Sequence, residues 1–165
     1  MVKEILLLGN PQLYQISSSV AEDEIAALKE VVADLHDTLM AFRAKYDAGR
    51  AIAAPQIGVF KRLIYMHIDQ PVAFINPALH FEDDELMEVL DDCMSFPELL
   101  VKVKRHKRCT IRFTDLELRE HQWQLEGDLA ELLQHEYDHL DGILATMRAI
   151  DTKSLCLRSQ RKGFR

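Results

Sequence analysis

The sequence has few cysteines, no long apolar run near its start and no excess of positive charge. Its three cysteines, Cys93, Cys109 and Cys156, are too few and too scattered for a disulfide framework, so we expect a reducing, cytoplasmic setting. The first apolar run, residues 5–8, is too short for a signal peptide or a membrane span. The formal net charge of −7 argues against general nucleic-acid binding, and we expect no direct sequence-specific contact with nucleic acids.

The composition that is present is typical of an ordinary globular protein. Hydrophobic residues make up 48% of the chain and charged residues 28%. A chain of 165 residues is long enough to bury a proper core, and we find no repeats, linkers or low-complexity segments. We therefore predict one domain over residues 1–165, in which residues 151–165 form a polar and basic tail.

Apolar residues recur at three- and four-residue steps in the first third of the chain. Residues 19–22 have the S-x-x-E form of a capping box, which marks the start of a helix. The stripe that follows predicts an amphipathic helix of roughly five to six turns, ending near residues 46–49. Its members are Ile25, Leu28, Val32, Leu35, Leu39 and Phe42.

The middle of the chain favours strands. The strand-like segments are residues 62–68, residues 72–75 (ended by Asn76-Pro77), residues 86–90, and the alternating stretch 99–125. The alternation predicts antiparallel strands with one face in solvent. A second helix follows, opened by residues 126–128, with Gly142 as its stop signal. The predicted class is α+β, with antiparallel sheets packed around this second helix.

The second helix contains the pattern H-E-x-x-H, formed by His135, Glu136 and His139. Residues four apart lie on one face of a helix, so the two imidazoles can bind one metal ion and Glu136 can reach a water on it. The alternative is an amphipathic helix whose histidines are solvated or hydrogen-bonded in the core. The pattern alone leaves both interpretations open.

Cys93 is the best candidate for a third ligand. It is a lone cysteine in a predicted turn between polar residues, 42 positions before His135. A Cys/His/His site that leaves the fourth position to water is of the open, catalytic type. Such a metal lowers the pKa of its bound water, and Glu136 is placed to accept the proton and pass it to a leaving amine.

With these residues the chain resembles the peptide deformylase family, whose three sequence motifs occur here in the same order. The motif G-x-G-x-A-A-x-Q is matched by residues 49–56, except that Ala51 stands where the second glycine is expected. The motif Q-H-E-x-D-H is matched completely by residues 134–139.

The remaining motif of the family, E-G-C-x-S, is matched at Cys93 and Ser95 but departs at Asp91 and Asp92. The order and spacing of the three motifs agree with the family, and the resemblance covers nearly the whole chain. Three motifs in register are far more specific than any one of them.

The resemblance implies a hydrolase that removes the formyl group from N-formylated peptides and releases formate. The substrate would be the formyl-methionine of nascent chains or another small formylated amine, with a transient ribosome association. Ferrous iron would be the native metal, and zinc, nickel or cobalt could substitute. The oxyanion donors would be the Gln56 side-chain amide and the Met94 backbone N–H.

The departures from the family concern the pocket for the first side chain of the substrate. The family has apolar residues where this chain has Arg50, Asp128 and Glu131. Either these charges pair with one another or point to solvent, or the preferred first side chain is not methionine. The other expected wall residues are Gly49, Ala51, Val89, Asp92, Leu132 and His135.

Asp92 also replaces a family glycine. Aspartate tolerates a left-handed backbone better than most residues, so the turn can survive the replacement. A carboxylate near the metal would raise the pKa of the bound water, and we therefore expect Asp92→Gly to raise activity on formyl-methionyl peptides.

Two functions of different classes remain open from the sequence. The first is the metal-dependent deformylase described above. The second is a weak or silent homologue that binds metal and peptide without catalysis. The intact Glu136 and Gln56 favour the first, because a silent protein needs neither a base nor an oxyanion donor. A general H-E-x-x-H protease fits poorly, because thiolate ligation and the Gln56 segment do not suit it.

Overall fold

The computed structural model describes residues 1–163 and confirms the α+β class. Its helices are α1 (Ile25–Tyr46) and α2 (Asp128–Leu140). Its strands are β1 (Ala51–Ala53), β2 (Leu63–His67), β3 (Pro71–His80), β4 (Leu86–Asp91), β5 (Leu99–His106), β6 (Arg108–Thr114), β7 (Glu120–Glu126) and β8 (Leu155–Leu157). Short 3-10 helices span Pro11–Tyr14, Glu22–Glu24, Ala54–Ile57, Ala145–Arg148 and Arg158–Gly163.

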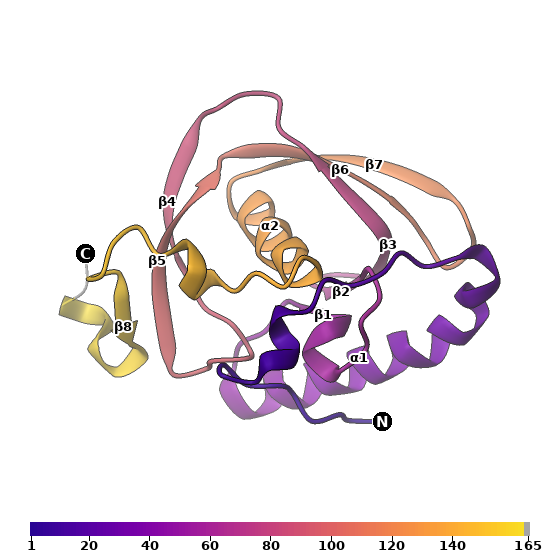
Figure 1. Ribbon diagram of the computed structural model, residues 1–165, viewed down its shortest axis with the longest axis horizontal. Coiled ribbons are helices and arrows are strands. Elements are labelled where there is room, and N and C mark those ends of the chain that lie inside the picture. The colour runs from indigo at the N-terminus through magenta and orange to yellow at the C-terminus, as the bar shows by residue number, and fades with distance from the viewer. Residues whose placement is uncertain (164–165) are drawn as a thin grey trace.

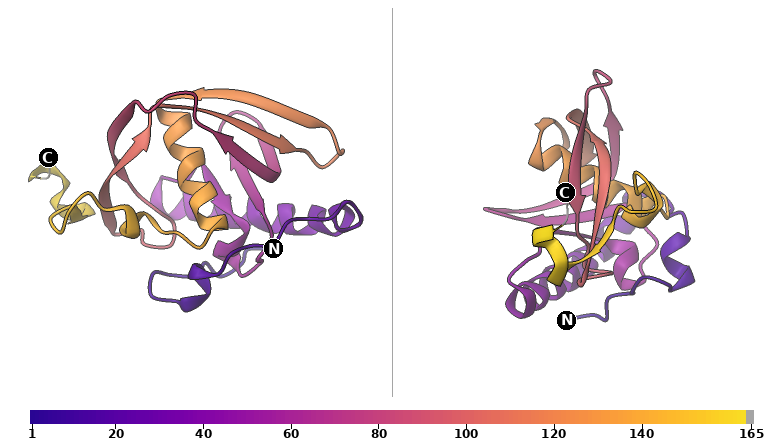
Figure 2. Two further views of the ribbon diagram at one scale, coloured as in Figure 1. Left: turned by 45° about the horizontal axis from the view of Figure 1, so that its top comes forward. Right: turned by 90° about the vertical axis from the view of Figure 1, so that its left-hand side faces the viewer.

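Two antiparallel sheets surround α2, as the sequence predicted. The larger sheet has the order β1-β2-β3-β6-β7 and the smaller one the order β4-β5-β8. Figure 1 shows α2 in the middle, with β4 and β5 on one side and β6 and β7 above it. The left-hand view of Figure 2 also shows α2 in the middle, while α1 lies along the outer edge of the molecule.

The alternation of side chains in β1 and β2 explains how the larger sheet holds both helices. In β2, Ile64 and Met66 belong to the core cluster that contains Leu132 and Leu133 of α2. Their neighbours Leu63 and Tyr65 point the other way, into the cluster formed with α1. Because successive side chains of a strand face opposite sides, a strand buried on both faces joins the two helices.

The start of α1 differs from the prediction. Ser19 does not cap the helix, which begins six residues later at Ile25. A short 3-10 turn precedes it, and there the Ala21 N–H donates to the Glu24 carboxylate at 2.8 Å. The Glu24 carboxylate, and not a side chain of the S-x-x-E pattern, satisfies this otherwise free N–H. The helix start predicted from that pattern therefore lies too early in the sequence.

The predicted end of the second strand is also wrong, because β3 continues through Asn76-Pro77 to His80. The register with β6 shifts between Ile75 and Ala78, and Asn76 has a positive φ of 48°. Pro77 cannot donate to the sheet, so the chain accommodates it in a bulge. The Asn76 amide holds the bulge by bonding the backbone N–H and C=O of Val20 at 2.8 and 2.9 Å.

The residues expected to form a polar tail contain a strand. Leu155–Leu157 pairs with β5, with Cys156 opposite Leu100, and residues 158–163 form a 3-10 helix. Residues 164–165 of the predicted tail lie outside the described residues. The prediction of a polar and basic tail did not include this strand, which forms because pairing with a distant strand outweighs the local polarity of the segment.

The segment from Ile5 to Leu8 is an extended packed arm and forms no strand. The Leu6 N–H donates to the Gln56 carbonyl and the Leu8 N–H to the Ser95 carbonyl, both at 2.8 Å. The arm thus supports two segments of the predicted site from behind. Among the described residues, no helix is both long and apolar enough to cross a bilayer.

Candidate active site

Helix α2 places two histidines side by side beneath the larger sheet. His135 and His139 are buried, and their ring centroids are 5.1 Å apart. Leu132, Leu133 and Leu140 of the same helix anchor it in the core. The four-residue spacing of the histidines and the apolar positions on either side of them therefore turn one helical face toward the interior.

Cys93 reaches this face from the turn that follows β4. Its Sγ is 3.3 Å from His139 Nε2, and the thiol is buried. One ligand atom from each of Cys93, His135 and His139 lies within 4.8 Å of the others. One sulfur and two imidazole nitrogens at this spacing match the ligand set of a single tetrahedral metal with an open fourth position, so the residues fit a metal ion.

A buried chain of charges holds His135 in orientation. His135 Nδ1 donates to Asp91 at 3.1 Å, and Asp91 accepts from Arg105 at 2.6 Å. Arg105 also donates at 2.6 Å to Asp138, which is bonded in turn by Arg148. Because Nδ1 is occupied by a carboxylate, Nε2 of His135 is left as the ligand atom.

The pKa directions in the site follow from burial and these charges. Burial lowers the pKa of His135, but the Cys93 and Asp91 charges outweigh it and raise that pKa well above its ordinary value. Burial and the neighbouring His135 lower the pKa of His139. For Asp91, burial is outweighed by His135 and Arg105, which keep its pKa low. The His135–Asp91 pair therefore favours the charged carboxylate.

Glu136 stands beside the ligand set with a free oxygen. Its side chain is buried, and Oε2 has no hydrogen-bond partner among the described residues. Burial raises the pKa of Glu136 to about 7. A carboxyl group with such a pKa can both accept and release a proton near neutral pH.

Gln56 approaches the cysteine from the other side. Its Nε2 donates to Ser95 Oγ at 3.1 Å and lies 3.5 Å from Cys93 Sγ, while its Oε1 accepts from the Ala53 N–H at 2.9 Å. Residues 51–57 form β1 and a 3-10 helix, which together carry this amide. The two hydrogen bonds fix the Gln56 side chain so that its amide NH₂ group faces the Cys93 thiol.

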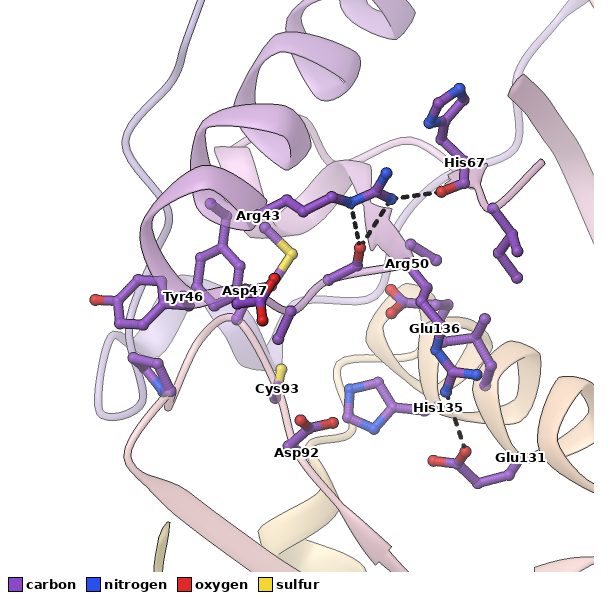
Figure 3. A pocket seen from close by; sticks show the side chains of 18 of the residues that line it. Arg43, Tyr46, Asp47, Arg50, His67, Asp92, Cys93, Glu131, His135 and Glu136 are labelled. Atoms are coloured by element: carbon purple, nitrogen blue, oxygen red, sulfur yellow. Dashed lines mark hydrogen bonds and ion pairs between the residues drawn. The ribbon is translucent and has the colours of Figure 1, made fainter. Parts of the chain in front are cut away.

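The ligand set opens into a cavity of about 530 Å³. Figure 3 shows Cys93, His135 and Glu136 at one side of it, with Arg50 and Glu131 close by. The predicted residues that line it are Gly49, Arg50, Ala51, Asp92, Cys93, Met94, Glu131, Leu132, His135 and Glu136. Val89 and Asp128 are not among them. Val89 packs instead against the cluster that contains Phe96, Val101 and Val103, and Asp128 lies on the exposed side of Arg50.

The three unexpected charges are paired. Arg50 bonds Asp128, whose side chain is 75% exposed, and its second nitrogen lies 3.6 Å from the Glu131 carboxylate, which is only 14% exposed. Burial and the neighbouring Asp91 raise the pKa of Glu131 to about 8. The structure thus shows the charges paired while Arg50 and Glu131 still line the cavity, and the preferred first side chain of the substrate stays a prediction.

Asp92 has an ordinary backbone conformation. The non-glycine residues with positive φ in the described chain are Asp47, Asn76 and Leu118, so the turn at Asp92 requires no left-handed residue. Its side chain is half-exposed and accepts from Arg158 at 3.1 Å. The carboxylate therefore faces a guanidinium at the rim of the cavity.

Sequence reasoning missed three arginines that shape the site. Arg105 was assigned only to an alternating strand, yet it shares the buried parity of Val101 and Val103, which was the available signal. Arg43 donates to the carbonyls of Gly49 and His67 and fixes the entry to β1. Arg158 was placed in the polar tail, and no local pattern indicates its contact with Asp92.

Comparison with known proteins agrees with this arrangement. Residues 2–154 match the family model described as polypeptide deformylase. The peptide deformylase of Dictyoglomus turgidum is 35% identical over 156 residues, which cover 94% of this chain and 97% of that protein. The peptide deformylase of Thermotoga maritima is 34% identical over 158 residues, with 94% and 92% covered.

Solved structures show the same fold. The crystal structure of the Thermotoga maritima peptide deformylase has a TM-score of 0.82 at 32% identity, covering 92% of this chain and 99% of that one. A Synechococcus elongatus peptide deformylase in complex with actinonin has a TM-score of 0.83 at 26% identity, covering 99% and 87%. With a family match over almost its whole length and these relatives, the chain belongs to the peptide deformylase family.

Proposed function

We propose that this chain hydrolyses the formyl group of N-formylated peptides in the cytoplasm, with the formyl-methionine of nascent chains as the family substrate. The observation that carries the proposal is a buried Cys/His/His set with an unpaired carboxylate oxygen beside it. Family membership supports the formyl peptide as substrate. Action on nascent chains would bring the protein into transient contact with the ribosome.

Cys93, His135 and His139 would hold one divalent metal, which we propose to be Fe²⁺ in the cell, with Zn²⁺, Ni²⁺ or Co²⁺ as substitutes. When bound, such an ion polarises the formyl oxygen and acidifies water, which supplies the nucleophile at neutral pH. The thiolate of Cys93 and the neutral Nε2 atoms of the two histidines would be the ligands. Asp91 serves this set by holding the proton on Nδ1 of His135.

Glu136 would move the proton. Its unpaired Oε2 accepts a proton from the attacking water as the C–O bond to the formyl carbon forms. The same oxygen then returns the proton to the amine nitrogen as the C–N bond breaks, which leaves formate and a free N-terminus. A pKa of about 7 suits both steps, because a general base works best near the operating pH.

Gln56 and Met94 would stabilise the negative charge that develops on the formyl oxygen. Ser95 and Ala53 already orient the Gln56 amide, so little reorganisation energy is needed when the charge develops. The Met94 backbone N–H is proposed as the second donor. Removing one such donor typically costs about 10²- to 10³-fold in kcat.

Formate release from formyl-Met-Ala-Ser by the iron- or nickel-loaded protein tests this proposal. We expect turnover by the unmodified chain and a loss of about 10²- to 10⁴-fold in kcat for Glu136→Gln, because the proton carrier is removed. Bound metal per chain should stay unchanged in the variant, because Glu136 is not a proposed ligand.

Glu120→Gln, an exposed change on β7, serves as the matched control and should retain full activity. If the metal-loaded protein releases no formate, or if Glu136→Gln is as active as the unmodified chain, the proposed function is wrong. The first of these outcomes would favour a silent, metal-binding homologue.

A further inference from the structure

We propose that the cavity beside the metal ligands selects an uncharged side chain with both a hydrogen-bond donor and an acceptor, such as a carboxamide, as the first side chain of the substrate. The inference rests on the proposed function, since it concerns the formylated molecule that the site would bind. It goes further by naming the chemistry of that first residue.

Glu131 and Arg50 line the part of the cavity in which we expect the first side chain of the substrate to lie. Glu131 precedes His135 by one turn of α2, so both side chains project from one face of the helix. Figure 3 shows Arg50 and Glu131 next to His135 and Glu136. All four residues line the same cavity as Cys93.

Arg50 is held at the cavity from several directions. One of its terminal nitrogens bonds Asp128 on the exposed side, and its backbone follows Gly49, whose carbonyl accepts from Arg43 at 2.9 Å. The other terminal nitrogen is 3.6 Å from Glu131 Oε2, which is longer than a hydrogen bond. The guanidinium and the Glu131 carboxyl therefore offer both a donor and an acceptor to a group in the cavity that lies against the two of them.

The nature of these two groups decides which side chain binds best. A thioether is only a weak acceptor and cannot donate, so it would cover Arg50 and Glu131 without satisfying them. A substrate carboxylate would bring a further negative charge toward Asp91, the carboxylate that neighbours Glu131, and a substrate ammonium would approach the like charge of Arg50. A carboxamide offers its oxygen to Arg50 and its NH₂ to Glu131, and introduces no like charge.

Two parallel measurements test the inference on the full-length, nickel-loaded protein. The first compares kcat/KM for formyl-Gln-Ala-Ser with formyl-Met-Ala-Ser and formyl-norleucyl-Ala-Ser. The second compares calorimetric binding of the deformylated products Gln-Ala-Ser and Met-Ala-Ser. We expect glutamine to exceed methionine and norleucine by at least about tenfold in both, the size of one well-made buried polar contact.

The double variant Arg50→Ile, Glu131→Ile should reverse the order and favour methionine and norleucine. Arg112→Leu, an exposed change on β6, is the control and should keep the glutamine preference. If the double variant does not fold, the order for the unmodified chain decides alone.

A preference of the unmodified chain for methionine in either measurement, or equal binding or no binding of the two product peptides, overturns the inference. Failure of the proposed function is seen separately. It would appear as an absence of formate from every formylated peptide, whereas product binding still reports the side-chain preference without turnover.

Discussion

Asp91 and Asp92 are adjacent in the sequence but lie in opposite surroundings. Asp91 is fully buried and accepts from Arg105 and His135, whereas Asp92 is half-exposed and accepts from Arg158. The alternation of side chains at the end of β4 separates them. One carboxylate therefore orients a proposed metal ligand while the other forms a surface ion pair at the cavity rim.

This difference sets the expected size of the effect of Asp92. Its charge is partly offset by Arg158, and exposed ion pairs are worth about 0–1 kcal/mol, so we expect Asp92→Gly to raise kcat only about two- to fivefold. Arg158→Gln leaves the carboxylate unpaired and should change kcat in the opposite direction. Steady-state formate release at fixed metal content measures both, and effects of the same sign would contradict this account.

At the scale of elements, Arg105 joins three of them. From β5 it bonds Asp91 at the end of β4 and Asp138 in α2, and all three side chains are buried. The smaller sheet and the helix that carries the proposed histidine ligands are thereby held in a fixed relative position. A polar residue in this position costs desolvation, which its two partners offset only while both bonds are made.

We predict that Arg105→Leu destabilises the protein by about 3–5 kcal/mol, because it leaves two buried carboxylates without their shared cation. Urea unfolding followed by circular dichroism measures the loss. Arg112→Leu, on an exposed position of neighbouring β6, is the matched control and should shift stability by less than about 0.5 kcal/mol. Equal effects of the two changes would show that the buried network contributes little.

At the scale of the whole molecule, the C-terminal segment completes the smaller sheet. The family match ends at residue 154, and β8 follows directly and pairs with β5. The Arg158 backbone N–H then donates to the Glu98 carbonyl at 2.8 Å, and its side chain to the Pro97 carbonyl at 3.0 Å. Pro97, Glu98 and Arg158 all line the cavity, so this segment supports one side of its rim.

Removing residues 155–165 should therefore lower both stability and activity. The edge of β5 would lose its paired strand, and a loss of only 1 kcal/mol lowers Tm by about 2–4 °C for a protein of this size. We expect at least this decrease, with a higher KM for formyl-Met-Ala-Ser. Full-length Arg158→Gln separates the two contributions, because it removes the side-chain contacts and keeps the strand. A truncated chain with unchanged Tm and KM would contradict the role assigned to β8.

The sequence by itself determined the parts of this protein that depend on local spacing. The four-residue step of His135 and His139 placed both on one helical face. The alternation over residues 99–125 predicted antiparallel strands, and Cys109 in that stretch lies in the core, where burial raises its pKa to about 11. The lone Cys93 in a polar turn was the best candidate for a third ligand, and the structure brings it to the histidines, while its role as a ligand stays a prediction. These predictions succeed because periodicity and turn chemistry act within a few residues.

Only the tertiary structure decided the contacts between segments far apart in the chain. The bulge at Asn76 depends on Val20, the strand at Leu155–Leu157 depends on β5, and the Arg158 contact depends on Asp92. The pairing of Arg50 with Asp128 and Glu131 likewise joins residues about eighty positions apart. None of these has a local signature, because the free energy comes from a partner that folding alone brings near.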